Sequence, residues 1–139
     1  MRIRTEAEYA LRCLIFLAED FFQEGTDARP VSVTRMAKRE KLSRDYVEQI
    51  FLRMRRSGLV KSTRGVQGGY LLAKAPGLIS VLEVFIALYG HAFEGPCGLM
   101  GRQCGHKQAK CSVASLWDNL GSEINEYLGS QTLEDLCAE

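Results

Sequence analysis

Apolar residues recur at intervals of three and four in several parts of this 139-residue chain, the spacing of one helical face. The clearest stripe follows Ser43 and consists of Val47, Ile50, Phe51 and Met54. Similar stripes lie within residues 5–25, 81–89 and 113–127. The pattern predicts a mainly α protein.

Residues whose side chains can accept a backbone hydrogen bond mark the expected helix starts. They are Thr5, Ser32, Ser43, Ser112 and Thr132. Ser80-x-x-Glu83 matches a capping box, in which side chain and backbone bond reciprocally. Gly58 stands where a left-handed residue would end the helix that follows Ser43.

Two short apolar segments, Leu59-Val60 and 70–72, flank the basic, glycine-rich stretch 61–69 and predict a β-hairpin. A further extended piece at 31–33 could pair with it. Helix 33–40, a turn at Lys41-Leu42 and the helix after Ser43 precede this hairpin. The order predicts a winged helix-turn-helix with a small two-stranded wing and a long C-terminal helix.

The helix after Ser43 has a second, polar face near its N-terminal end, where the recognition helix of such a motif enters the major groove. Arginine, glutamine and glutamate there can read base edges, and basic residues further on can contact phosphates. The predicted DNA contacts are Ser43, Arg44, Asp45, Tyr46, Glu48, Gln49, Arg53, Arg55, Arg56, Lys61, Arg64, Gly65 and Gly68. The alternative is an ordinary solvated helix face.

The apolar stripe of the last long helix alternates steps of four and three, as in a coiled coil. It consists of Val113, Trp117, Leu120, Ile124 and Tyr127. A helix that pairs two copies would place two recognition helices in successive major grooves of a two-fold symmetric operator. The alternative is that this stripe packs on its own domain.

The net charge of +1 conceals an asymmetry between the two halves of the chain. Residues 1–78 hold 15 basic and 9 acidic residues, whereas residues 79–139 hold 3 and 8. This division, with Ala75-Pro76-Gly77 as a boundary, favours a DNA-binding domain at 1–78 and a sensor and dimerisation region at 79–139. The sequence holds no candidate membrane span or secretory signal, so we expect a cytoplasmic protein.

Three of the five cysteines, Cys97, Cys104 and Cys111, are evenly spaced in a glycine-rich loop. Thiolates suit zinc and iron–sulfur clusters, so a metal or cluster site is one interpretation. A thiol-based redox switch and three unrelated cysteines are the others. Cys13 and Cys137 are expected to have no such role.

Three motifs resemble one known family: Tyr46-Val-Glu48-Gln49-Ile-Phe51, Arg56-Ser-Gly58-Leu59-Val60 and Arg64-Gly65-x-x-Gly68-Gly69-Tyr70. Together with the opening Met-Arg-Ile-Arg-Thr-Glu, they closely resemble bacterial transcription regulators of the IscR/NsrR type, in the Rrf-two superfamily. The resemblance covers nearly the whole chain. It implies a homodimer joined through the long C-terminal helix.

The resemblance also implies a [2Fe–2S] or [4Fe–4S] cluster on Cys97, Cys104 and Cys111, although the spacing here is wider than usual for the family. IscR-like members place a histidine three residues after the last cysteine, where this chain has Ala114. Some relatives use an N-terminal acidic residue from the other protomer, and Glu8 stands at that place. His106 and His91 are alternative ligands, and an ion pair with Arg12 is the alternative role of Glu8.

We therefore expect a cluster-sensing, dimeric transcription regulator, more a repressor than an activator, that senses redox state, nitric oxide or iron status. Its partners would be an operator duplex and a second copy, with no membrane and no small-molecule substrate. A cluster-free thiol-redox or partner-binding regulator is the alternative, and an iron–sulfur carrier is a weaker one, since a carrier has no need of a basic wing. No nucleophile–base pair stands in a recognisable setting, so an enzyme is not expected.

Overall fold

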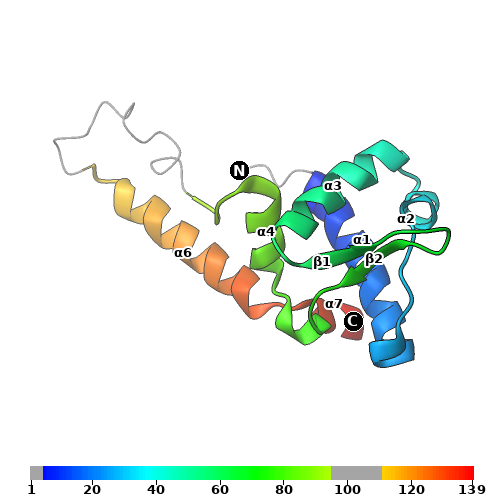
Figure 1. The fold of residues 1–139 in the computed structure, drawn as a ribbon. Helices are drawn as coiled ribbons and strands as arrows, with labels where there is room; N and C mark the ends of the chain where they lie inside the picture. Colours follow the sequence, from blue (N-terminus) through cyan, green and yellow to red (C-terminus); the bar gives the residue numbers. More distant parts are fainter. Residues whose placement is uncertain (1–4, 95–110) are drawn as a thin grey trace.

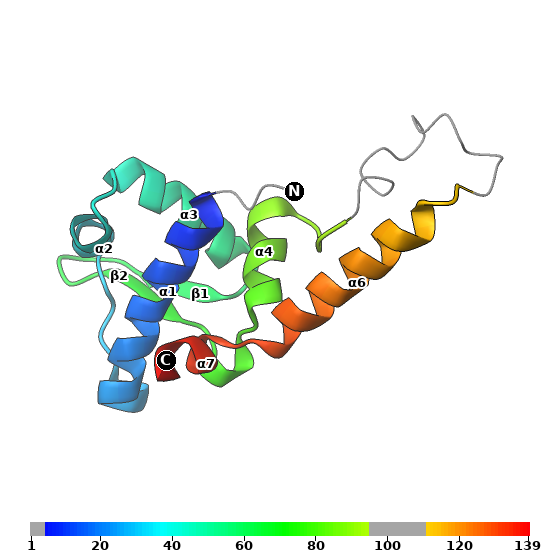
Figure 2. The same ribbon diagram turned by 180° about the vertical axis from the view of Figure 1, so that it is seen from behind.

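The computed structural model describes residues 5–94 and 111–139. Helices and a single hairpin form a compact body, and one helix, α6, extends outward from it (Figures 1 and 2). The elements in chain order are α1 (Thr5–Glu24), η1 (Gly25–Asp27), α2 (Val33–Glu40), α3 (Arg44–Arg56), β1 (Val60–Thr63), β2 (Gly69–Leu72), η2 (Pro76–Leu78), α4 (Val81–Tyr89), α6 (Ala114–Ser130) and α7 (Leu133–Ala138).

Most of the predicted helix starts are confirmed. The hydroxyls of Ser32, Ser43, Ser80 and Thr132 accept backbone hydrogen bonds at the first turns of α2, α3, α4 and α7. Ser80 and Glu83 form the expected capping box, with the Glu83 amide 3.2 Å from the Ser80 hydroxyl. These local bonds satisfy amide groups that have no partner inside the helix.

Two predicted helix starts were wrong. Thr5, the first described residue, already belongs to α1, so Thr5 is not the cap of this helix. The chain makes a turn after Cys111, whose carbonyl accepts from the Ala114 amide at 3.1 Å. Helix α6 therefore starts later than Ser112 implied, and its N-cap is Val113, which offers no side-chain hydrogen bond.

The body is organised around α1, which packs against α2, α3, α4, α7 and β2. Small side chains on its buried face allow these close approaches, since Ala7, Ala10 and Ala18 are almost completely buried. The recognition helix α3 supplies the opposing layer of the core, with Val47, Ile50, Phe51 and Met54 all fully buried. Both buried stripes are the ones that helical periodicity predicts, although Phe21 at the end of α1 is only half-buried.

The wing is an antiparallel hairpin in which Val60 pairs with Leu72 and Thr63 with Gly69. Val31 adds an isolated bridge to it, with the Val31 and Tyr70 amides donating to each other's carbonyls at 3.0 and 2.9 Å. The predicted pairing of 31–33 with the wing is confirmed at this residue. Gly69 is required there, because a Cβ at this position would collide with the Val31 carbonyl.

The end of the chain returns to the body. The Leu133 amide donates to the Ile79 carbonyl at 3.0 Å, and the Val81 amide donates to the Gln131 carbonyl at 2.8 Å. Leu133 is fully buried, and α7 packs on α1. The C-terminal region thus contributes to the core of the N-terminal one, and the division at residues 78 and 79 stays a prediction.

The two serines that precede α4 and α6 provide a test of the capping assignments. Ser80→Ala removes a hydroxyl that satisfies the Glu83 amide, so we expect the free energy of unfolding to fall by about 1 kcal/mol. Ser112→Ala is the matched control, because Ser112 is not the N-cap of α6; its effect should stay within about 0.5 kcal/mol. Urea unfolding followed by circular dichroism measures both. Equal effects of the two substitutions would contradict the assignment.

Candidate nucleic-acid interface and sensor region

The recognition helix α3 presents a polar face to solvent on the side opposite its buried stripe. Arg44, Asp45, Glu48 and Gln49 are all exposed there. Ser43 has a defined structural role as well, because its hydroxyl accepts from the Tyr46 amide at 3.2 Å. The arrangement leaves the first turns of α3 free to contact base edges in a major groove.

The wing lies beside this helix and carries exposed cations. The Arg55 guanidinium donates to the Ser62 hydroxyl at 3.1 Å, which joins the end of α3 to β1. Lys61 and Arg64 are exposed on the hairpin. Gly68 closes the turn, with its amide 3.0 Å from the Gly65 carbonyl, in a space that a Cβ would not fit.

The cations of the described segments can be divided into those with and those without an ion pair. Arg44, Arg56, Lys61 and Arg64 make no ion pair within the described part of the chain. Several cations elsewhere are ion-paired: Arg35 with Asp20, Arg39 with Glu19, and Lys74 with Glu83. Arg29, Lys38 and Lys41 make no ion pair in the described segments either. The positive charge that remains unpaired on α3 and the wing is therefore available to phosphates.

Arg53 departs from the predicted set. Its guanidinium pairs with Glu6 of α1 and donates at 3.0 Å to the backbone carbonyl of Leu88 in α4. These contacts engage the guanidinium within its own chain, and the phosphate contact of Arg53 stays a prediction. The structure thus gives Arg53 a structural position, which periodicity did not reveal.

Tyr46 also faces inward more than its place in the predicted set suggests. It is half-buried, and its ring meets that of Tyr9 edge-on at 6.1 Å between centroids. Burial raises the pKa of Tyr46, with a further contribution from the Glu6 carboxylate. Burial likewise raises the pKa of Tyr70, so both phenols remain neutral near neutral pH.

Helix α2 is attached to α1 by contacts that the sequence analysis missed. The Arg39 guanidinium lies 4.1 Å from the centre of the Phe16 ring and 2.7 Å from the Glu19 carboxylate. The Glu19 hydrogen bond raises the pKa of Arg39 still further above its ordinary value. Lys41 ends α2 in a left-handed conformation, with φ at 57°, a backbone state for which lysine gives no sequence signal.

The predicted metal ligands are only partly within the described residues. Cys97, Cys104 and His106 lie outside them, whereas Cys111 is half-buried just before α6. Glu8 is exposed on α1, and its carboxylate lies 3.4 Å from the Arg12 guanidinium, the contact expected from its alternative role. No group of three metal-binding side chains occurs within residues 5–94 and 111–139.

The two cysteines expected to have no sensing role are both in unreactive surroundings. Burial raises the pKa of the Cys13 thiol to about 12, with the Glu40 carboxylate adding to the effect. Burial also raises the pKa of Cys137, and Glu19 and Glu134 act in the same direction. Since the thiolate is the reactive form, neither cysteine is suited to redox chemistry near neutral pH.

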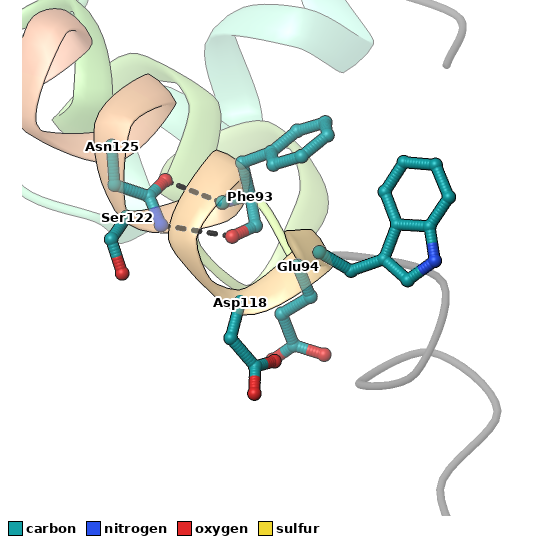
Figure 3. Close-up of a pocket in the computed structure, with 7 residues that line it drawn as sticks. Phe93, Glu94, Asp118, Ser122 and Asn125 are labelled. Atoms are coloured by element: carbon teal, nitrogen blue, oxygen red, sulfur yellow. Dashed lines mark hydrogen bonds between the residues drawn. The ribbon is translucent and has the colours of Figure 1, made fainter. Parts of the chain in front are cut away.

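The chain just before the cysteine-rich segment is attached to α6 by a side chain that the sequence did not single out. Asn125 accepts from the Phe93 amide and donates to the Phe93 carbonyl, each at 2.8 Å (Figure 3). A cavity of about 230 Å³ lies beside this contact, lined also by Glu94, Trp117 and Asp118. His91 is exposed, and its Nδ1 lies 2.7 Å from the Ala92 carbonyl.

Helix α6 leaves most of its apolar residues uncovered. Its first turn lies farthest from the body, and Gly121 is its single buried residue (Figure 1). Of the five predicted dimerisation residues, Val113, Leu120 and Tyr127 are exposed and Trp117 and Ile124 are half-buried. Leu116, which the predicted stripe omitted, is 57% exposed.

Helices that could cross a membrane were not found in the described segments.

A sequence model of the Rrf2 family, described as "Iron-dependent Transcriptional regulator", matches residues 3–139. The chain is 37% identical over 137 residues to the HTH-type transcriptional regulator IscR of Xenorhabdus nematophila, a match that covers 98% of this chain and 79% of that protein. This similarity confirms the resemblance that the motifs in α3 and the wing predicted.

Two solved structures share the fold. T. potens IscR matches with a TM-score of 0.74 and 31% identity, over 98% of this chain and 85% of that one. CymR (YrzC), the global cysteine regulator of B. subtilis, matches with a TM-score of 0.75 and 29% identity, over 99% of this chain and 97% of that one. The predicted winged helix-turn-helix is thereby confirmed.

Proposed function

Because the chain belongs to the Rrf2 family of DNA-binding transcription regulators, we propose that it acts as a dimeric repressor whose DNA affinity is controlled at its cysteine-rich segment. The observation that carries the proposal is a group of exposed cations on α3 and the wing that make no ion pair in the described segments: Arg44, Arg56, Lys61 and Arg64. By contrast, Arg53 of α3 and Arg35 and Arg39 of α2 pair with carboxylates of α1. A surface of this kind attracts a polyanion, and the polar first turns of α3 can read bases beside it.

The DNA contacts follow from the positions of the exposed side chains. Arg44, Glu48 and Gln49 would meet base edges, because they lie at the N-terminal end of α3. Arg56, Lys61 and Arg64 would bind phosphates and set the register of the protein on the duplex. Two such modules in a dimer would occupy the half-sites of a two-fold symmetric operator.

The dimer would form through α6. Exposed apolar side chains along this helix, with Tyr127 65% exposed, are a surface that a monomer has reason to cover. A second copy of the same helix offers the complementary stripe, as two-fold symmetry requires.

The sensor would be an iron–sulfur cluster held by Cys97, Cys104 and Cys111, with Glu8 of the second protomer as the fourth ligand. Similarity to IscR and the iron-dependent family description support this assignment. So does the position of Cys111 directly before α6, because a change at that cysteine is one turn from the pairing helix. When bound, the cluster would supply an oxidisable and removable crosslink at this end of α6.

A cluster-free thiol sensor is the second candidate. The similarity to CymR, a cysteine regulator, favours it. In that case the same three loop cysteines would be the reactive thiols, since Cys13 and Cys137 have raised pKa values.

Removing one wing cation tests the DNA interface. Arg64→Ala should weaken binding to specific and non-specific duplexes alike and reduce the slope of log K against log salt by about 1. Lys74→Gln removes the same charge from a residue already paired with Glu83, so it should leave the slope unchanged. Fluorescence anisotropy between 50 and 300 mM salt gives both slopes. An unaltered slope in Arg64→Ala would exclude the wing from the interface.

Placing a charge on the exposed stripe tests the dimer. Tyr127→Asp should convert the dimer to a monomer without unfolding it, because the side chain is exposed in the single chain. Asn119→Asp introduces the same charge at an exposed position of α6 outside the stripe and should remain dimeric. Sedimentation velocity distinguishes the two states, and a wild-type monomer at all concentrations would refute the proposal.

Anaerobic absorption spectra with iron and sulfide analysis decide between the two sensors. Cys104→Ala should lose the visible bands and the iron, whereas Cys137→Ala should retain them. Glu8→Gln should weaken the bands more than Arg12→Gln does, because both remove the ion pair but only the first removes the carboxylate. A colourless, iron-free wild-type protein after anaerobic reconstitution would reject the cluster and leave the thiol sensor, which oxidation should release from DNA.

A further inference from the structure

The C-terminal end of α4 is held by a residue of the recognition helix. The Arg53 guanidinium of α3 donates to the Leu88 carbonyl at 3.0 Å and pairs with Glu6 of α1. Leu88 lies in the last turn of α4, where backbone carbonyls lack helical partners and attract cations. One half-buried side chain thus joins α3, α1 and α4, and its orientation depends on where α4 ends.

The same short piece of chain is attached to α6 a few residues later. Gly90 ends α4 in a left-handed conformation, with φ at 81°. Phe93 then exchanges two backbone–side-chain hydrogen bonds with Asn125, each 2.8 Å long (Figure 3). The segment from Leu88 to Phe93 is therefore bound by the recognition helix at one end and by α6 at the other.

We infer that Arg53 is a positioning residue that couples this segment to DNA reading. A displacement of Phe93 relative to α6 moves the Leu88 carbonyl, and Arg53 transmits the movement to α3. Charge-assisted hydrogen bonds of this kind have strong directional preferences, whereas the apolar contacts between α3 and α4 tolerate small shifts. The inference rests on the proposed function and deepens it, because the coupled segment leads directly toward Cys97 along the chain.

The chain carries its own reporter of this segment. Trp117 is the single tryptophan of the sequence, and it lines the same cavity as Phe93, Glu94 and Asn125. Coupling between two sites is reciprocal, so a segment whose position affects duplex binding at α3 is itself shifted when a duplex binds. Tryptophan emission therefore reports, at the α6 end of the segment, whether duplex binding at α3 has an effect there.

The test uses the full-length protein with its thiols reduced and its iron removed by a chelator. The probe is a dye-labelled duplex that the wild-type protein selects from a random-sequence library, and anisotropy and Trp117 emission are followed in one titration. In the wild type, emission should change with the same midpoint as anisotropy. Arg53→Met should still bind the duplex but lose that emission change. Arg56→Met, a surface arginine of the same helix, should bind more weakly and keep it.

A second variant changes the α6 end of the segment. It keeps the inference testable if Arg53→Met fails to fold. Asn125→Ala should alter duplex affinity by about 2- to 30-fold, and Asn119→Ala, also on α6, should not. In the Arg53→Met background the Asn125→Ala effect should vanish. Because Arg53→Met leaves Glu6 without its partner, Glu6→Gln/Arg53→Met is measured beside it and should behave in the same way.

Three results would overturn the inference: wild-type emission that stays constant at saturating duplex, full emission change in both Arg53 variants, or additive effects of Asn125→Ala and Arg53→Met. Failure of both the iron-free protein and the anaerobically reconstituted protein to select any duplex would overturn the proposed function and this inference together. A protein that never binds iron would reject the cluster sensor alone, since the titration is made on the iron-free form.

Discussion

Burial of α1 is the constraint on which the rest of this structure depends. Its alanine-rich face lets α2, α3, α4, α7 and β2 approach the same helix, so the DNA reader and the end of the chain share one core. Apolar burial contributes most of the free energy but has no direction. Polar contacts at the rim add direction for two of these helices, because Arg39 of α2 pairs with Glu19 and Arg53 of α3 pairs with Glu6.

Those rim contacts also determine which basic residues of the chain are ion-paired and which are not. A cation that holds two helices together is neutralised, and one that does not remains available to a phosphate. Arg53 and Arg56 lie three residues apart on the same helix, yet the first is inside the body and the second is free. Total charge therefore says less about DNA binding than the count of cations that folding leaves unpaired.

Of the long helices, α6 is the one least stabilised by contacts within its own chain. It packs on α4, its apolar stripe faces outward, and Asn125 attaches it to the segment that precedes the cysteines. A pairing helix that also anchors the sensor segment would let assembly and sensing act on the same element. The contacts from Phe93 through Leu88 to Arg53 connect α6 to the recognition helix α3.

Sequence alone determined most of the local structure: the stripes of α1 and α3, the caps at Ser32, Ser43, Ser80 and Thr132, the wing, and the family. These features depend on residues within a few positions of one another, through helical periodicity and capping hydrogen bonds, so the sequence encodes them directly. Tertiary structure decided the rest. The contacts of Arg53 with Leu88 and Glu6 and of Asn125 with Phe93 span 35, 47 and 32 residues, and only packing around α1 brings such partners together.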